Sequence, residues 1–256
     1  MLLSKVPVLD KGFVQLIRRS CEIVVDEETG EVKYEPCTDL FVVNDAKVST
    51  AKESSEWGTG EARLLNFLGR EDHTSPFRGA VMTFRIKAPL FVARQIFKYA
   101  VGTDHDESMV QRDPFFSWNE LSLRYTSDPE FYVPKADQWR KAPEKRRQGS
   151  SNECFTEECG GTALANTLSW NVNNGFLDYK NAIEQGVAPE QARLFLPAYA
   201  MYTSWVMTTS LQGLCHILEQ RLPHDAQSET RQYAEALKTI GMSIYPNAIT
   251  AYLKEK

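Results

Sequence analysis

The sequence predicts an α+β protein, in which a mixed sheet comes largely from the first half of the chain and helices make up the second half. Residues 79–87 alternate between apolar and other side chains, as a half-buried strand does. Residues 21–35 hold two β-rich runs around a polar turn, and from about residue 161 the chain continues as successive helix-length segments. Strands followed by a block of helices are typical of the α+β class.

The first half is expected to form strands and two helices. Asp26–Gly30 separates two β-rich runs, which is a hairpin signal. Pro89 directly follows a predicted strand, and proline is favoured in the first turn of a helix. The predicted elements are, in order, a short strand over 6–16 with a turn at 10–12, the hairpin at about 21–35, a helix over 60–68, a strand over 79–87 and a helix over 88–99.

The second half follows a loop predicted over 101–116, which is acidic and aromatic. Residues 134–160 form a polar stretch, and the basic run at 140–147 within it is expected to be a solvated face. The segments after it have helical length and spacing. The predicted helices cover about 162–185, 189–196, 199–222 and 225–240.

Residues 117–125 are interpreted as an extended segment that could form one wall of a polar site. Side chains alternate along a strand, so Glu120, Ser122 and Arg124 share one face. The opposite face, which can anchor in a core, carries Leu121, Leu123 and Tyr125. An arginine fork suits phosphate, and a carboxylate and a hydroxyl beside it can fix a polar ring. A half-buried strand with a solvated face explains the same pattern.

The composition of the 256 residues is that of a globular protein, with 42% hydrophobic and 25% charged residues. The net charge of −5 provides no general attraction to nucleic acid or to an anionic membrane, so we expect neither as a partner. No membrane span or signal peptide is recognisable. The five cysteines are odd in number and scattered, which suits reduced thiols in a cytoplasmic protein.

No metal site is predicted. Cys154 and Cys159 are the only close cysteine pair, and no histidine or further cysteine lies near them. The motif Asp104–Glu107 is explained by a solvated acidic loop. The glycine-rich fingerprints of phosphate loops and dinucleotide sites are also missing from the sequence.

Three isolated polar residues are ambiguous from the pattern alone. Arg221 continues the apolar stripe of the segment 199–222, where it could reach water past the apolar surface or donate to a polar ligand in a cleft. Arg193 lies just before Pro197, and a surface ion pair would explain it. His73 precedes a proline turn, where a hydrogen-bonded structural role is common.

Motifs spread over most of residues 6–255 resemble, in order, those of the flavin-dependent thymidylate synthases. The two most informative are the run Ala88–Phe97 and the segment Asn119–Tyr125. The others are Val8–Val14, Ala46–Ser49, His73–Phe77, Ala192–Pro197, Leu214–Arg221 and Ala226–Glu229. Because the motifs are colinear, the resemblance is stronger than any one of them.

The resemblance implies a single α+β domain over residues 1–256 that forms a homotetramer, with active sites where subunits meet. It implies reductive methylation of dUMP to dTMP, with methylenetetrahydrofolate as carbon donor, FAD as hydride carrier and NADPH as reductant. Such chemistry needs no cysteine of the enzyme, because reduced flavin delivers hydride and arginine charge polarises the uracil.

The resemblance also implies a role for each matched residue. The substrate-binding residues would be Gln95, Glu120, Ser122, Arg124, Arg193 and Arg221, with Arg124 and Arg193 on the phosphate. The catalytic residues would be His73, Ser122 and Arg221. The cofactor-binding residues would be Ser49, His73, Lys98, Tyr99, Glu120, Ser210, Gln212, His216 and Asp225.

The predicted flavin side departs from the family pattern. The family pattern is Arg-His-Arg, then seven residues, then Ser. This chain has Lys98-Tyr99-Ala100 and then the twenty-one residues 101–121 before Ser122, so residues of about 101–116 are an atypical insertion. Lys98 keeps one point charge but not the guanidinium fork. The family's Asn-x-Arg becomes Ser210-Leu211-Gln212, and Asp225 stands in place of a histidine, with His224 displaced by one position.

Three interpretations remain open. The chain is a divergent but active flavin-dependent thymidylate synthase, in which the insertion or Tyr99 supplies replacement flavin contacts. Alternatively, it is a related C5 methylase or hydroxymethylase of UMP or dUMP. A third interpretation is a non-catalytic nucleotide-binding homologue that has lost flavin.

Overall fold

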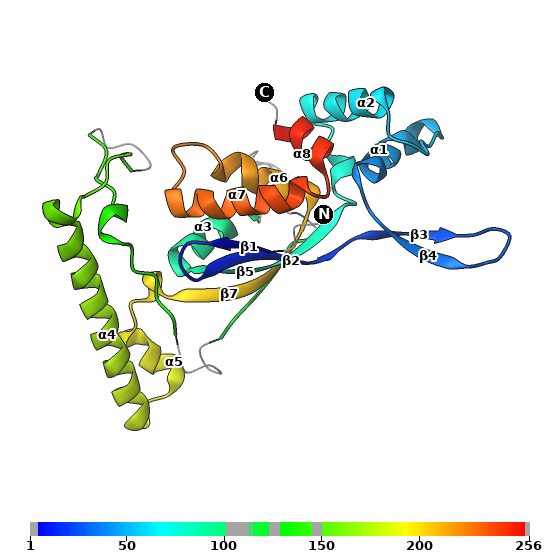
Figure 1. The fold of residues 1–256 in the computed structure, drawn as a ribbon. Coiled ribbons are helices and arrows are strands. Elements are labelled where there is room, and N and C mark those ends of the chain that lie inside the picture. Colours follow the sequence, from blue (N-terminus) through cyan, green and yellow to red (C-terminus); the bar gives the residue numbers. More distant parts are fainter. Residues whose placement is uncertain (1–4, 101–112, 114, 123–128, 145–149, 254–256) are drawn as a thin grey trace, which may run out of the picture.

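Five strands form one antiparallel sheet, and a separate two-stranded hairpin extends beyond its end (Figure 1). The structure is a computed structural model that describes residues 5–100, 113, 115–122, 129–144 and 150–253. The strands are β1 (Lys5–Val8), β2 (Gly12–Arg19), β3 (Cys21–Val25), β4 (Val32–Pro36), β5 (Val81–Pro89), β6 (Ser117–Glu120) and β7 (Tyr202–Ser210). The helices are α1 (Asp39–Lys47), α2 (Thr59–Arg70), α3 (Leu90–Ala100), α4 (Thr162–Glu184), α5 (Pro189–Ala192), α6 (Leu211–Arg221), α7 (Ser228–Met242) and α8 (Pro246–Leu253).

The strand order in the sheet is β1-β2-β5-β7-β6, and each described neighbouring pair is antiparallel. Helices α3, α6 and α7 lie over one face of this sheet (Figure 1). Val14, Ile86 and Trp205, which occupy one cross-strand row, are buried under them. This arrangement of a sheet with helices confirms the predicted α+β class.

Most elements predicted for the first half are confirmed. The segment 6–16 forms β1 and the start of β2, and the hairpin at 21–35 is β3 and β4. The predicted helix over 60–68 lies inside α2. The helix expected over 88–99 begins at Leu90 instead, because Ala88 and Pro89 still pair with β7 as the end of β5.

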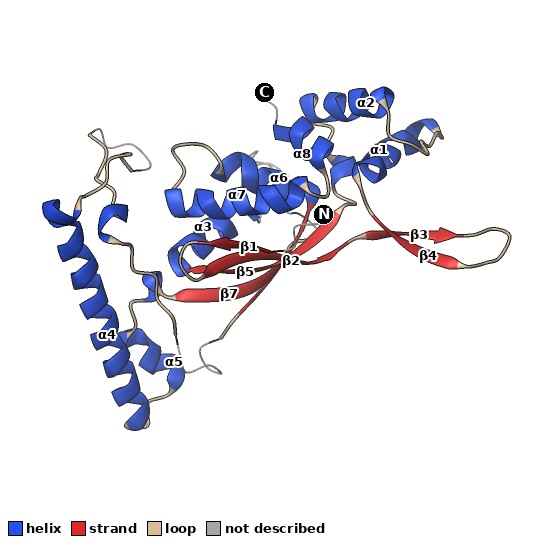
Figure 2. Cartoon of the chain, in the orientation of Figure 1, coloured by secondary structure: helices blue, strands red, loops and turns tan. Residues whose placement is uncertain are grey.

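The helix predicted over 199–222 is wrong in its first half. Residues 202–210 form the strand β7 (Figure 2), and only 211–221 are helical. In the sheet, β7 lies between β5 and β6. β-Branched and aromatic side chains make up most of this segment and fit a pleated surface better than a helix.

The other predicted helices of the second half differ from the observed ones at their ends. The helix predicted over 189–196 continues after α5 as a 3-10 turn over 193–195, and α7 begins later than predicted.

Helices α1 and α8 were not predicted, and a single buried carboxylate joins them. Asp39, at the start of α1, is 6% exposed and accepts hydrogen bonds from the backbone N–H groups of Asn247 (3.0 Å) and Ala248 (2.8 Å). These are N–H groups of the first turn of α8, which have no partner inside the helix. The two partners are more than 200 positions apart in the sequence, so no local sequence pattern predicts this contact.

No helix among the described residues is long and apolar enough to cross a membrane. The longest, α4, carries several exposed apolar side chains and stands away from the helices that cover the sheet (Figure 1).

Candidate functional site

Glu120, at the end of β6, is held in place by two donors. Its Oε1 accepts a hydrogen bond from Thr203 Oγ1 at 2.7 Å, and its Oε2 accepts one from Trp118 Nε1 at 3.1 Å. Trp118 in turn stacks on the buried Trp205 of β7, with 4.4 Å between ring centroids. The carboxylate is therefore oriented by the sheet, although the residue remains exposed at its surface.

Glu120 and Arg193 line one cavity of about 350 Å³. The cavity lies where β6 and β7 meet the turn after α5, and Thr203 contributes to its wall. Arg193 is exposed, and its Nε donates to the carbonyl oxygen of Glu190 at 3.1 Å, which orients the guanidinium. Two residues 73 positions apart in the sequence, both predicted to bind the nucleotide, thus share one polar cavity.

The rest of the predicted row is only partly described. Ser122 is half-buried just past the end of β6, whereas Arg124 lies outside the described residues. Leu121 was expected to anchor in the core, and that expectation is wrong, because it is 48% exposed and lines the same cavity. β6 is an edge strand, and the half-buried Trp118, which packs against the main core, anchors it instead.

Arg221 and Gln95 form a second group. Arg221, at the end of α6, donates from NH2 to Oε1 of Gln95 on α3 at 3.1 Å, and both residues are half-buried. The packing of α3 against α6 brings them together. Neither residue lines the cavity that contains Glu120 and Arg193. The described nucleotide residues therefore lie in two groups within one chain.

Ser49 and His73 both lie at the surface, on turns next to α1 and α2. The Ser49 hydroxyl donates to the carbonyl oxygen of Ala46 at 3.1 Å. The His73 ring packs against Phe67 with 5.6 Å between centroids. Both residues are exposed, so both side chains can meet a ligand or a second chain.

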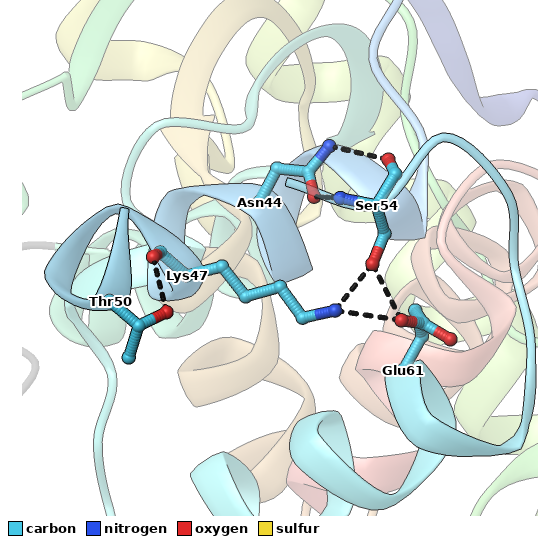
Figure 3. A network of polar contacts seen from close by, with 5 residues as sticks. All are labelled: Asn44, Lys47, Thr50, Ser54 and Glu61. Atoms are coloured by element: carbon cyan, nitrogen blue, oxygen red, sulfur yellow. Dashed lines mark hydrogen bonds and ion pairs between the residues drawn. The ribbon is translucent and has the colours of Figure 1, made fainter. Parts of the chain in front are cut away.

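A polar network fixes the turn that carries Ser49 (Figure 3). Lys47 Nζ contacts Glu61 Oε1 at 2.8 Å, and both groups bond the Ser54 hydroxyl, which donates to Glu61 at 2.6 Å. Asn44 exchanges hydrogen bonds with the backbone of Ser54 at 3.1 and 2.9 Å. The hydrogen bonds from Lys47 and Ser54 lower the pKa of Glu61 to about 2.

This network predicts an acid-sensitive contribution to stability. Because the pKa of Glu61 in the folded protein lies below its ordinary value of 4.5, the contribution is present above pH 4.5 and disappears as the pH falls towards about 2. We expect Lys47→Met to be less stable than the parent near pH 6, and the difference to shrink with acidification. Urea unfolding at several pH values measures it. Arg70→Met, which breaks the exposed pair with Glu71, should show a smaller and flatter difference.

The residues predicted to contact FAD at the N-cap of α6 and within α6 are buried in the single chain. Ser210, Gln212 and His216 are 1%, 4% and 4% exposed. Ser210 caps α6, since its hydroxyl accepts from the N–H of Gly213 at 3.0 Å. Gln212 Oε1 accepts from Arg78 Nε at 2.6 Å.

Asp113, which the sequence did not single out, also lies at this end of α6. It is 5% exposed, and its Oδ2 accepts from the N–H of Ser210 at 2.7 Å and from Thr209 Oγ1 at 2.9 Å. It belongs to the insertion predicted at 101–116, of which residues 101–112 and 114 lie outside the described part. A carboxylate of the chain itself therefore sits against the N-terminus of α6.

The remaining predicted cofactor residues are Lys98, Tyr99 and Asp225. Lys98 and Asp225 are exposed, and the side chain of Tyr99 lies outside the described residues. Asp225 is adjacent to His224, whose carbonyl oxygen accepts from Arg231 NH1 at 3.2 Å. None of these placements identifies their ligand, so their role in cofactor binding stays a prediction.

A second polar centre was missed because Arg140 was expected to lie on a solvated face. Arg140 NH2 instead pairs with Glu229 Oε2 at 2.6 Å, with side chains 23% and 6% exposed, and this hydrogen bond raises the pKa of the guanidinium. Tyr132 lies beside the pair, and burial raises its pKa to about 12. Cavities of about 620 and 560 Å³ share these three residues. Only Glu229, in the motif Ala226–Glu229, signalled this centre in the sequence.

Comparisons with known proteins agree with the motifs. The family model described as "Thymidylate synthase complementing protein" matches residues 32–247. A flavin-dependent thymidylate synthase of Thermus thermophilus is 35% identical over 248 residues, covering 96% of this chain and 77% of that protein. The Thermotoga neapolitana enzyme of the same name is 33% identical over 254 residues, covering 98% and 94%.

A solved structure has a similar fold. The UMP/dUMP methylase PolB of Streptomyces cacaoi, bound with 5-Br dUMP, superposes with a TM-score of 0.73 at 25% identity, covering 96% of each chain. The family model spans most of this chain, and the relatives match it nearly from end to end. The chain therefore belongs to the flavin-dependent thymidylate synthase family.

Proposed function

We propose that this chain catalyses the reductive methylation of dUMP to dTMP, with methylenetetrahydrofolate as carbon donor, FAD as hydride carrier and NADPH as reductant. The observation that carries the proposal is the cavity that both Glu120 and Arg193 line, since one residue carries a guanidinium and the other a fixed carboxylate. An arginine fork suits a phosphate, and a fixed carboxylate can accept from a sugar hydroxyl or a ring N–H. A nucleoside monophosphate carries both kinds of partner.

Each described residue then has a defined task. Arg193 holds the nucleotide phosphate, together with Arg124. Gln95 and Arg221 contact the nucleotide, and the charge of Arg221 polarises the uracil by stabilising negative charge on its carbonyl oxygen. The hydrogen bond between Arg221 and Gln95 keeps the guanidinium oriented before the nucleotide arrives. Ser122 lies beside the pyrimidine.

The division of these residues into two groups supports a site completed by a second subunit. Arg193 and Glu120 line one cavity, whereas Arg221 and Gln95 lie outside it. A homotetramer with active sites between subunits would bring one group from each of two chains to one nucleotide. The proposal includes a cytoplasmic location, which would keep the five free cysteines reduced.

FAD fits one part of the predicted cofactor site and not another. Ser49 and His73 are exposed, and Lys98 offers a charge for a phosphate, so these residues would hold the cofactor. The N-terminus of α6 is a poor place for a flavin phosphate, because Asp113 already bonds the N–H of Ser210 there. When bound, FAD supplies the hydride that completes the methyl group.

The solved relative favours a second candidate, the same C5 methylation with UMP as an additional substrate. Release of tritium from C5 of labelled dUMP and UMP, with the folate and NADPH present, distinguishes the two. We expect release from dUMP at least about tenfold faster in kcat/KM, which corresponds to about 1.4 kcal/mol. Comparable release from both nucleotides would establish the UMP/dUMP activity instead.

The same purified protein tests the non-catalytic alternative. We expect it to bind FAD, which is measured as a yellow protein or by a flavin fluorescence titration. Release of the flavin on denaturation would show that it is not covalently attached. A chain that binds dUMP but neither FAD nor methylenetetrahydrofolate would overturn the proposed function.

A further inference from the structure

The β3–β4 hairpin has one apolar face that nothing in the described chain covers. Ile23 pairs with Tyr34 and Val25 pairs with Val32, so these four side chains point to the same side. They are 67%, 68%, 54% and 49% exposed. The hairpin extends away from the helices and from the sheet (Figure 1). An exposed apolar face of this kind is typical of a protein interface.

The opposite face and the turn of the hairpin are strongly acidic. Glu22 pairs with Glu35, and Val24 pairs with Lys33, on the side away from Tyr34. Residues 21–36 contain six carboxylates and one lysine, which gives them a net charge of −5, equal to that of the whole chain. The rest of the chain is therefore neutral overall. A surface that receives this hairpin should combine apolar side chains with positive charge.

The side of the five-stranded sheet that no described helix covers has this composition. Gln15, Arg85 and Val206 form one cross-strand row on it, and Lys5 pairs with Gln15 at the β1 edge. Lys5, Arg18 and Arg85 are exposed, and Phe13 lies among them with Lys5 Nζ at 4.2 Å from its ring centroid. None of the described strand residues on this side is acidic, although Lys87 at one end of it forms an ion pair with Glu130. The face is thus basic and partly apolar.

The hairpin is short enough to lie along a strand of the sheet. Each hairpin strand has five residues and spans about 17 Å, whereas the eight residues of β2 span about 26 Å. Only Ser20 separates β2 from β3, so the hairpin leaves the sheet along the direction of β2. A two-fold axis close to Ser20 would lay each hairpin along the sheet of the other copy, in a reciprocal contact.

We propose that the face formed by Ile23, Val25, Val32 and Tyr34 docks on the basic, helix-free face of the five-stranded sheet in a second copy of this chain. The acidic turn contributes attraction to the cations of that face, while the apolar side chains supply the buried area. The contact adds a named surface to the proposed homotetramer. It does not depend on which nucleotide is methylated.

Adjacent valines on opposite faces provide the test. Val25→Asp places a carboxylate in the contact, whereas Val24→Asp makes the same change in the same strand on the face that stays in water. Light scattering along a dilution series measures the mass of the full chain. We expect Val25→Asp to dissociate at a protein concentration at least about tenfold higher than the parent does, because a buried unpaired carboxylate is costly. Val24→Asp should follow the parent.

A change on the receiving face keeps the test independent of hairpin folding. We expect Arg85→Glu to weaken association by a similar factor, and Lys238→Glu, an exposed change on α7, to leave it unchanged. Equal masses for the parent, Val25→Asp and Arg85→Glu would overturn the docking, as would a parent that is monomeric throughout. Tritium release from dUMP is measured separately from the mass. If the parent released no tritium, the proposed function would be refuted, but the docking result would still stand.

Discussion

Arg193→Ala is expected to weaken dUMP binding about 100-fold, or by about 3 kcal/mol, since charge-assisted hydrogen bonds to a phosphate contribute on this scale. Arg193 offers an exposed guanidinium in the cavity that also contains Glu120. Its Nε is already committed to the carbonyl oxygen of Glu190, which leaves the terminal nitrogens directed as a fork. Isothermal titration calorimetry with dUMP measures the effect.

Two further variants make this result specific. Arg193→Lys retains the charge but loses the planar fork of donors. We expect it to bind dUMP with about one-tenth of the affinity of the parent or more. Arg231→Ala removes another arginine whose guanidinium donates to a backbone carbonyl, that of His224, and it should bind dUMP like the parent. An unchanged dissociation constant in Arg193→Ala would show that the cavity between β6 and α5 does not receive the phosphate.

Arg221→Ala is expected to lower kcat by about 100- to 1,000-fold, the range found when one group that stabilises developing negative charge is removed. Arg221 is half-buried at the end of α6, and its hydrogen bond to Gln95 fixes its orientation. A preoriented charge stabilises the transition state more than the ground state, so the loss should appear in kcat more than in KM. Steady-state methylation of dUMP separates the two constants.

Gln95→Leu tests whether orientation matters as well as charge. It removes the acceptor of the 3.1 Å hydrogen bond but keeps Arg221, so we expect a smaller fall in kcat than in Arg221→Ala. Thermal unfolding of both variants detects any loss of folding at this half-buried position. A variant Arg221→Ala that is folded, binds dUMP and retains the kcat of the parent would remove Arg221 from the catalytic residues.

The comparison of β7 with the neighbouring helix shows where sequence patterns fail. Residues 202–210 and 211–221 were interpreted as one helix, because the apolar spacing in the second half extends without an obvious break. Ser210 is the break, since it caps α6 with its hydroxyl. The position of β7 between β5 and β6 then stabilises the strand through pairing on both sides.

For the polar residues as well, sequence motifs identified some candidates, whereas the contacts between them depend on the folded chain. Glu120 and Arg193 were identified from motifs, but their common cavity follows from the antiparallel pairing of β6 with β7 and from the turn after α5. Arg140 was misjudged because it belongs to a basic run, and its partner Glu229 lies 89 positions later. The role of Asp113 could not be predicted from the sequence, because its partners Thr209 and Ser210 lie almost 100 positions later and come close only in the folded chain.

The sequence by itself determined the α+β class, the hairpin, most helices and the family, since these depend on local periodicity and on motifs read in order. The tertiary structure alone decided that β7 is a central strand and that the described nucleotide residues form two groups. It also decided that the described residues leave one sheet face and one hairpin face uncovered. Contacts between distant segments depend on strand pairing and on the packing of buried surfaces, and a local stretch of sequence predicts neither.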